Sequence, residues 1–236
     1  MKTVFHKADT RGHADHGWLN AWHSFSFAGY HDPERVHFGV LRVLNDDTIA
    51  GGMGFGAHPH DNMEIITIPL SGQLEHKDSM GNTGIISNGE VQVMSAGTGI
   101  QHSEKNKNSK EALKLLQIWL FPNQKNVEPR YDKRAFDLTA AKNSLLTIVS
   151  PMGSTEGLNI HQNAWFHLGK LDKDFSLTYE LKDKANGVYA FLIDGEVIIN
   201  GEKLNRRDAI GITEAEKLEI TANNDAELLL MELPMY

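Results

Sequence analysis

The chain has 236 residues, enough for one large or two small domains, with 40% hydrophobic and 23% charged residues as in ordinary globular proteins. It contains no cysteine, which excludes disulfides, thiolate metal sites and cysteine nucleophiles, so any metal must bind to nitrogen and oxygen. A net charge of -8 gives no general attraction for nucleic acid, and no apolar run approaches the roughly 20 residues that span a membrane. The basic groups at 130–134 and 203–207 are expected to be ordinary solvated faces.

The first residues lack the apolar stretch of a secretion signal, so we expect a cytoplasmic protein. Strand and turn signals dominate the rest of the chain, and no long helix is predicted. Residues 110–122 have apolar side chains on both alternating faces, which favours a buried strand over a helix. Further buried strands are expected at 142–151 and 226–234, each ended by a proline. Asp194-Gly195 and Asn200-Gly201 predict tight hairpin turns, and the whole pattern predicts an all-β protein.

The domain organisation is indicated by a connector and by a short repeat. Residues 122–138 are polar, contain two prolines and show little periodicity, so we predict two domains, 1–135 and 136–236. Residues 70–74 (LSGQL) resemble 192–197 (LIDGEV), and an Asn-Gly-Glu turn follows each segment. The repeat predicts two related β-lobes.

Histidine gathers in the first half, with ten of the twelve at or before position 102. Alternation along one strand would place His58, His60 and Glu64 on the same face, together with Asn62. His102 and Glu104 share a face in the same way if their segment is extended. Three imidazoles and one carboxylate suit Fe(II), Mn(II), Co(II), Ni(II), Cu(II) or Zn(II), and open coordination positions would indicate catalysis. Either glutamate can supply the carboxylate.

The same residues resemble the cupin pattern, in which a glycine, HxH and a glutamate are followed by GxxHxxxN. The matching positions are Gly52, His58, His60, Glu64, Gly99, His102 and Asn106. One departure is Gly97, which stands where cupins usually have a proline.

The resemblance is closer to one cupin family, the pirins, and is strongest over residues 10–135. The stretches that carry it are RGHADHGWLNAWHSFSF, HPHDNMEIITIPLSG, EHKDSMGNTG and MSAGTGIQHSE. Within the family, the chain is similar to bacterial pirin-like quercetin 2,3-dioxygenases. The resemblance implies a bicupin, with two β-barrel or jelly-roll lobes facing each other. It also implies one divalent ion, expected to be Fe(II), and the ligands His58, His60, His102 and Glu104. Glu64 is kept as the alternative ligand.

The implied activity is cleavage of a flavonol such as quercetin by dioxygen, with release of carbon monoxide. Glu104 would be catalytic and accept the proton of the flavonol 3-hydroxyl. The alternatives are a pirin that regulates a protein partner through its metal, or another cupin enzyme such as an isomerase or decarboxylase. A monomer is expected. Residues proposed as walls of the substrate pocket are Phe55, Met63, Ile66 and Met94.

The second lobe is expected to be free of metal. Counting by the offsets of the internal repeat places no histidine at the equivalents of the four ligands, which are Leu181, Asp183, Glu214 and Glu216. In the first lobe, His76 and Asp78 are expected near the metal pocket or in a solvated loop.

Overall fold

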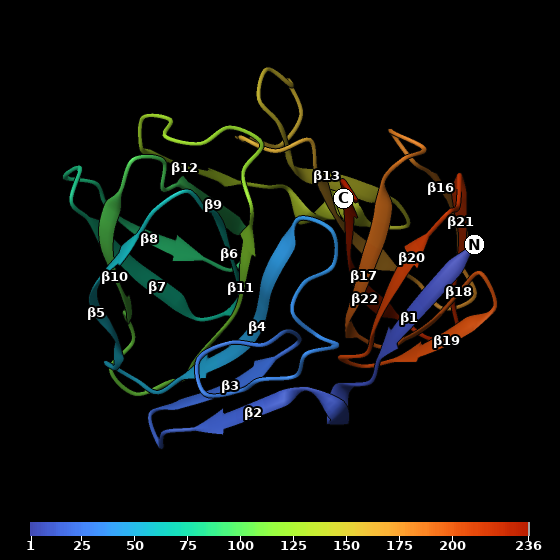
Figure 1. The fold of residues 1–236 in the computed structure, drawn as a ribbon. Helices are drawn as coiled ribbons and strands as arrows, with labels where there is room; N and C mark the ends of the chain where they lie inside the picture. Colours follow the sequence, from blue (N-terminus) through green and yellow to red (C-terminus); the bar gives the residue numbers. More distant parts are fainter. Residues whose placement is uncertain (236) are drawn as a thin grey trace.

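The computed structural model describes residues 1–235, which form two β-lobes lying side by side (Figure 1). Each lobe combines a seven-stranded sheet with a four-stranded sheet. Within the described part of the chain the only helices are two short 3-10 turns, η1 (Ala8–Thr10) and η2 (Leu138–Ala141). None of the helices there is long and apolar enough to cross a membrane. The predicted all-β bicupin class is confirmed.

The first lobe carries the histidine-rich strands in its smaller sheet. The larger sheet has the order β12-β9-β6-β11-β4-β3-β2. Its strands are β2 (Gly12–Asp15), β3 (Leu19–His23), β4 (Leu41–Ile49), β6 (Glu64–Ser71), β9 (Glu90–Ser95), β11 (Leu113–Leu120) and β12 (Arg130–Ala135). The smaller sheet has the order β5-β10-β7-β8. Its strands are β5 (Gly54–His60), β7 (Gln73–Asp78), β8 (Thr83–Ser87) and β10 (Ile100–Asn106).

The second lobe repeats this arrangement. Its larger sheet has the order β1-β20-β17-β22-β15-β13-β14 and its smaller sheet the order β16-β21-β18-β19. The larger sheet contains β1 (Lys2–His6), β13 (Leu145–Pro151), β14 (Leu158–Ile160), β15 (Trp165–Leu171), β17 (Gly187–Asp194), β20 (Ala209–Thr213) and β22 (Ala226–Leu233). The smaller contains β16 (Ser176–Glu180), β18 (Glu196–Ile199), β19 (Glu202–Asn205) and β21 (Lys217–Ala222). Because β1 pairs with β20, the first strand of the chain completes a sheet of the second lobe.

The corners between sheets explain two of the predicted turns. Gly72 and Gly195 have φ of 82° and 88°, and each lies where the chain passes from the larger sheet of its lobe to the smaller one. Asp194-Gly195 is therefore a corner, and the hairpin predicted there is wrong. Asn200 and Gly201 both have positive φ and join the paired strands β18 and β19, so that hairpin is confirmed.

The predicted buried strands are confirmed as β11, β13 and β22. The predicted connector is only partly right, because β12 lies within it and pairs with β9 at the edge of the larger sheet. An edge strand is solvated along one side, so its polar composition reads like a loop. The boundary near residue 135 stays a prediction.

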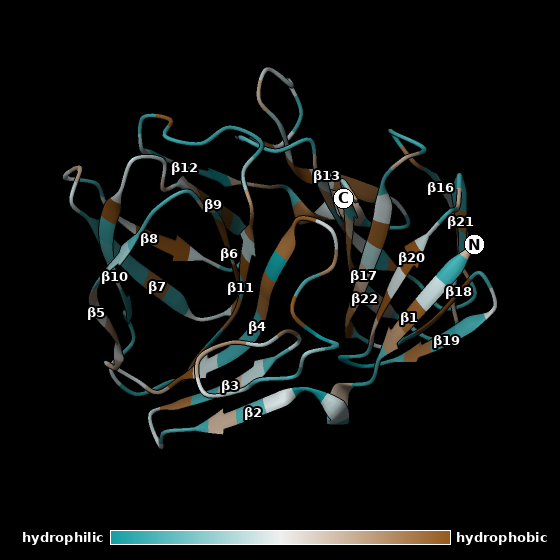
Figure 2. Cartoon of the chain, in the orientation of Figure 1, coloured by the Kyte–Doolittle hydropathy of each residue, from teal (hydrophilic) through white to brown (hydrophobic). Residues whose placement is uncertain are grey.

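The largest hydrophobic core spans the two lobes. It joins residues of the first lobe, such as Ile66 and Leu116, to residues of the second, such as Phe166 and Phe191. Figure 2 shows hydrophobic segments on the strands of the larger sheets, for example β4 and β17, and hydrophilic segments in the outer loops. Burial of this shared apolar surface stabilises the two lobes against each other.

Candidate metal centre

Three histidines converge from two neighbouring strands of the smaller sheet. The antiparallel pairing of β5 with β10 places His58 opposite His102. The Nε2 atoms of His60 and His102 are 3.0 Å apart, and one ligand nitrogen from each of the three histidines lies within 4.8 Å of the others. Such a spacing lets three nitrogen atoms reach one ion.

The strand that carries His58 and His60 ends earlier than the alternation suggested. β5 stops at His60, and Asn62 adopts a φ of 45° while its backbone N–H donates to the carbonyl of Gly97. The chain turns at this point, and Glu64 opens β6 in the larger sheet. The prediction of one continuous strand face from His58 to Glu64 is wrong, because the left-handed asparagine breaks the two-residue period.

In β10 the alternation holds. His102, Glu104 and Asn106 are buried, whereas Gln101 and Lys105 between them are exposed. The carboxylate of Glu104 accepts hydrogen bonds from Gln117 Nε2 at both oxygens, at 3.2 and 3.0 Å. The amide of Gln117, on β11, thus holds the carboxylate in a fixed orientation.

The protonation states suit a metal. Burial, assisted by the neighbouring histidines, lowers the pKa of His60 to about 4 and that of His102 to about 2. Both imidazoles are therefore neutral near pH 7, which is the form that donates a lone pair to a metal. Burial also raises the pKa of Glu104, and a divalent cation would favour its charged form. The donor set of imidazoles and a buried carboxylate fits a divalent ion.

A fourth histidine lies behind this cluster. His76 is fully buried on β7, and ligand atoms of His76, His102 and Glu104 lie within 4.8 Å of one another. Its ring stacks on Tyr131, and its Nε2 is 3.3 Å from Asp78. His76 therefore belongs to the interior of the lobe beside the metal cluster, and the solvated loop considered from the sequence is wrong.

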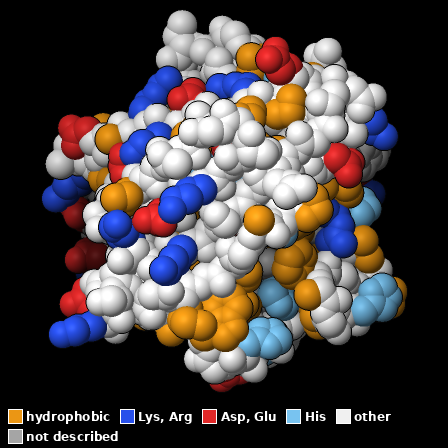
Figure 3. All heavy atoms as spheres, turned by 90° about the vertical axis from the view of Figure 1, so that its left-hand side faces the viewer, with side chains coloured by type: hydrophobic (Ala, Val, Ile, Leu, Met, Phe, Trp, Pro, Cys, Tyr) orange, Lys and Arg blue, Asp and Glu red, His pale blue; other side chains and the backbone are white. Residues whose placement is uncertain are grey.

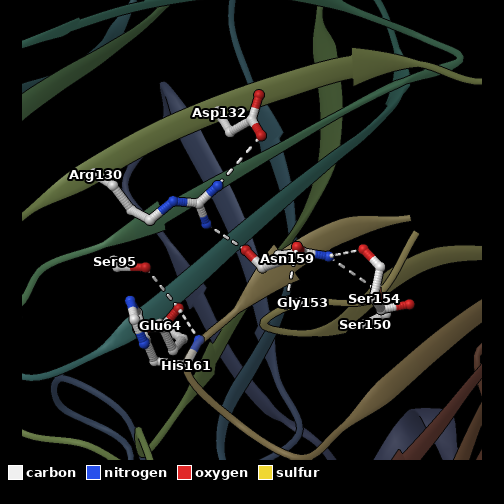
Figure 4. Close-up of polar contacts among 9 residues, drawn as sticks. All are labelled: Glu64, Ser95, Arg130, Asp132, Ser150, Gly153, Ser154, Asn159 and His161. Atoms are coloured by element: carbon white, nitrogen blue, oxygen red, sulfur yellow. Dashed lines mark hydrogen bonds and ion pairs between the residues drawn. The ribbon is translucent and has the colours of Figure 1, made fainter. Parts of the chain in front are cut away.

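The carboxyl of Glu64 points toward the second lobe (Figure 4). Its Oε2 accepts hydrogen bonds from Ser95 Oγ at 2.8 Å and from the backbone N–H of His161 at 3.1 Å. Beside it, Arg130 donates to the backbone carbonyl of Asn159. Of the residues described, Glu64 belongs to neither group of potential ligands. It connects the two lobes.

Replacing Glu64 with glutamine is expected to reduce the loss of stability between pH 5 and pH 8. Burial, opposed by the bonds from Ser95 and His161, raises the pKa of Glu64 to about 7. Because this folded-state pKa lies above the unfolded value of 4.5, the carboxyl lowers the free energy of unfolding as pH rises from about 4.5 to 7. Urea unfolding at pH 5 and pH 8 should show a decrease that is smaller in Glu64→Gln by up to about 3 kcal/mol. Equal decreases in the two proteins would contradict this assignment.

An aromatic cavity of about 510 Å³ opens beside the cluster. Trp18 and Phe55 meet edge-on with ring centroids 5.3 Å apart, and Phe27 meets Trp119 at 5.4 Å. The full lining is Trp18, Phe27, Asn45, Asp47, Gly54, Phe55, Gly56, Ala57, His58, Glu104, Gln117 and Trp119. Figure 3 shows histidines beside hydrophobic side chains at the surface of this lobe. The cavity can take a planar, mainly apolar ligand in contact with the metal cluster.

The walls of this cavity were only partly foreseen. Phe55 is confirmed as a lining residue, whereas Met63, Ile66 and Met94 pack within the hydrophobic cores. Trp18, Phe27 and Trp119 were missed because the turn before β3, the loop after it and β11 are distant from the histidine motifs in sequence. Asp47 was missed as well. It is 4% exposed, and burial raises its pKa to about 8.

The close approach of β5 to β10 depends on Gly54. A Cβ added there would lie 2.1 Å from the carbonyl oxygen of Glu104, whereas a Cβ at Gly56 would meet nothing within 4 Å. We expect Gly54→Ala to lower the free energy of unfolding by about 1 to 3 kcal/mol and to weaken metal binding, because β10 must shift. Gly56→Ala is the matched control. Urea unfolding and metal titration of both variants test this, and equal behaviour would contradict it.

Strand pairing assigns the second-lobe equivalents of the cluster. Tyr179 pairs with Leu218 as His58 pairs with His102, and Ile220 takes the position of Glu104. The offsets counted from the sequence were out of register. The count that gave Glu214 and Glu216 equated Asn88-Gly89 with Asn200-Gly201, but the first pair joins β8 to β9 and the second joins β18 to β19.

Comparison with known proteins finds related sequences for both lobes of the chain. Residues 4–120 match the family model Pirin, and residues 147–233 match the model of the quercetinase C-terminal cupin domain. The chain is 45% identical to a quercetin 2,3-dioxygenase of Escherichia coli, with 97% of each chain covered. It is 40% identical to a pirin-like protein of Caulobacter vibrioides, with 95% of this chain and 96% of the other covered.

A solved structure shows the same arrangement. The bacterial pirin YhhW of Escherichia coli in complex with nickel(II) superimposes with a TM-score of 0.94 at 42% identity and covers all of both chains. Full-length identity of this order, a shared fold and the matching family model lead to one conclusion: the chain belongs to the pirin family.

Proposed function

We propose that this protein is a metal-dependent dioxygenase that cleaves a flavonol such as quercetin with dioxygen and releases carbon monoxide. The observation that carries the proposal is the convergence of three imidazoles and a buried carboxylate beside an aromatic cavity of about 510 Å³. Full-length similarity to a quercetin 2,3-dioxygenase supports the choice of substrate.

The proposed ligands of one divalent ion are His58, His60, His102 and Glu104. Fe(II) is the expected ion, and Ni(II) is supported by the pirin structure that contains it. When bound, the ion acts as a Lewis acid that lowers the pKa of the flavonol 3-hydroxyl. We also propose that the first lobe, residues 1–135, holds the only metal, because Tyr179, Leu218 and Ile220 replace the ligand positions in the second.

The carboxylate of Glu104 accepts the proton of the 3-hydroxyl. Gln117 holds this carboxylate through both oxygens, and Thr67 Oγ1 donates to Gln117 Oε1 at 3.1 Å and so fixes the amide. The hydrogen bonds from Thr67 to Gln117 and from Gln117 to Glu104 orient the base, Glu104, before the substrate arrives.

The aromatic walls orient the substrate and exclude water. Trp18 and Phe55 form one aromatic pair of the cavity, and Phe27 and Trp119 form another, so a planar flavonol finds rings to pack against. In the overall reaction the flavonol takes up one dioxygen molecule and loses one carbon as carbon monoxide. The C2–C3 and C3–C4 bonds break, C3 leaves with the oxygen of its own hydroxyl as carbon monoxide, and both atoms of dioxygen remain in the ring-opened product.

The test is quercetin-dependent oxygen uptake and carbon monoxide release by the metal-loaded protein, with His60→Ala as the metal-deficient control. The proposal requires equal amounts of oxygen consumed and carbon monoxide released, and loss of both in the control. If the metal-loaded protein consumes no oxygen, flavonol cleavage is wrong. A regulatory pirin, or an isomerase or decarboxylase, would then explain the site.

A further inference from the structure

A second cavity, of about 410 Å³, lies at the junction of the lobes and is rich in basic side chains. Four cationic residues and only two carboxylates line it, in a chain whose net charge is -8. The lining residues are Ala8, Asp9, Arg11, Asn20, Trp22, Asp46, Thr48, Lys114, Arg206 and Arg207. Positive charge is therefore concentrated in this cavity, although the protein as a whole is negatively charged.

A buried guanidinium group, that of Arg11, and a half-buried one, that of Arg207, share a single carboxylate oxygen. Arg11 Nη1 and Arg207 Nε each lie 3.3 Å from Oδ2 of Asp46, and their side chains are only 5% and 13% exposed. Two cations held beside one anion in a place of low dielectric leave a positive charge that is not neutralised. The solvated basic face predicted at 203–207 holds for the exposed Lys203 and Arg206 but not for Arg207, which is half-buried.

Asp9 also lines the cavity, and two further carboxylates nearby, Asp208 and Asp194, have other partners. Asp208 accepts hydrogen bonds from the backbone N–H groups of Ala8 and Asn205, and Asp194 is paired with Arg206 at 3.0 Å. Among the described groups, Nη1 of Arg207 is buried with no hydrogen-bond partner. A buried donor of this kind is usually satisfied, so its partner is missing from the chain itself.

Aromatic rings also hold the two guanidinium groups in place. Arg11 lies 5.5 Å from the ring centroid of Trp22 and 5.7 Å from that of Phe191, and Arg207 lies 6.0 Å from Phe191. Arg207 has a φ of 68°, a conformation that residues other than glycine rarely adopt. The donors are fixed before any ligand arrives.

We propose that this cavity binds a small oxyanion, a phosphate or a carboxylate, through Arg11, Arg207 and Lys114. Planar guanidinium groups match the geometry of such anions, and Lys114 adds an exposed ammonium from β11. Arg207 belongs to the second lobe, and Arg11 lies in the segment between β1 and β2 that crosses from one lobe to the other (Figure 1). A bound anion connects the lobes.

The test is calorimetric titration of the metal-loaded, full-length protein with inorganic phosphate and, separately, with succinate, at constant ionic strength. Lys114→Gln is expected to weaken binding about tenfold, as for loss of one charge-assisted hydrogen bond. Because Lys114 is exposed, this variant should fold normally. Arg207→Gln should abolish binding, and Arg134→Gln, an exposed arginine on β12, is the charge-matched control.

Binding of phosphate alone, succinate alone or both supports the proposal and defines the oxyanion, provided that Lys114→Gln weakens it and Arg134→Gln does not. Absence of binding at about 10 mM of either anion overturns the proposal, because a built site should saturate well below that concentration. Equal binding by the wild type and Lys114→Gln also overturns it, since the anion would then bind elsewhere, for example at the metal. None of these outcomes depends on dioxygenase activity.

Discussion

Replacing His102 with alanine is expected to lower metal affinity at least about 100-fold and to abolish oxygen uptake with quercetin. His102 is the residue shared by both groups of potential ligands, is 2% exposed, and has its Nε2 only 3.0 Å from that of His60. Changes to residues that merely support a ligand already reduce affinity about 10- to 100-fold, so loss of the ligand itself should exceed this. Metal content after dialysis and oxygen-electrode traces measure the two effects.

Two controls separate metal loss from unfolding. His31→Ala removes an exposed imidazole and should leave metal content and turnover unchanged. His102→Gln fills most of the space of the buried ring, so a thermal transition close to that of the metal-free wild type would show that the fold survives. Stoichiometric metal in His102→Ala would contradict the assignment of His102 as a metal ligand.

The candidate site was predictable from the sequence where a single strand carries it. His102 and Glu104 lie two residues apart within β10, and strand alternation suffices to place them on one face. The same rule failed between His60 and Glu64, because Asn62 adopts a left-handed conformation and the chain changes sheets. No alternation of side chains in the sequence marks such a corner. Asparagine at position 62 permits the left-handed conformation but does not require it.

The parts that sequence reasoning missed depend on contacts between distant segments. Trp18, Phe27 and Trp119 come to one cavity through the order of strands in the larger sheet, which local patterns do not determine. β12 was taken for a connector because an edge strand can be polar on the side that faces solvent. The fold class was easier to predict than the cavity lining. Apolar strands that end at a proline and Asn-Gly turns indicate β-structure even when the pairing of the strands is unknown.

Replacing Glu104 with glutamine should lower kcat by about 10²- to 10⁴-fold, the usual contribution of a positioned base. Gln117 donates Nε2–H to both oxygens of Glu104, and in the variant one of these donors faces another amide N–H₂. A buried donor left without an acceptor reduces stability by about 1 to 3 kcal/mol. Steady-state oxygen uptake and urea unfolding report the two losses separately.

The swapped double variant, Glu104→Gln with Gln117→Glu, distinguishes the two roles. It restores an amide-to-carboxylate hydrogen bond between β10 and β11, so most of the lost stability should return. The carboxylate, however, then belongs to residue 117, and turnover should stay low because the proton acceptor has left its place beside the histidines. Recovery of turnover together with stability would mean that Glu104 acts only through packing, and its role as the base would be wrong.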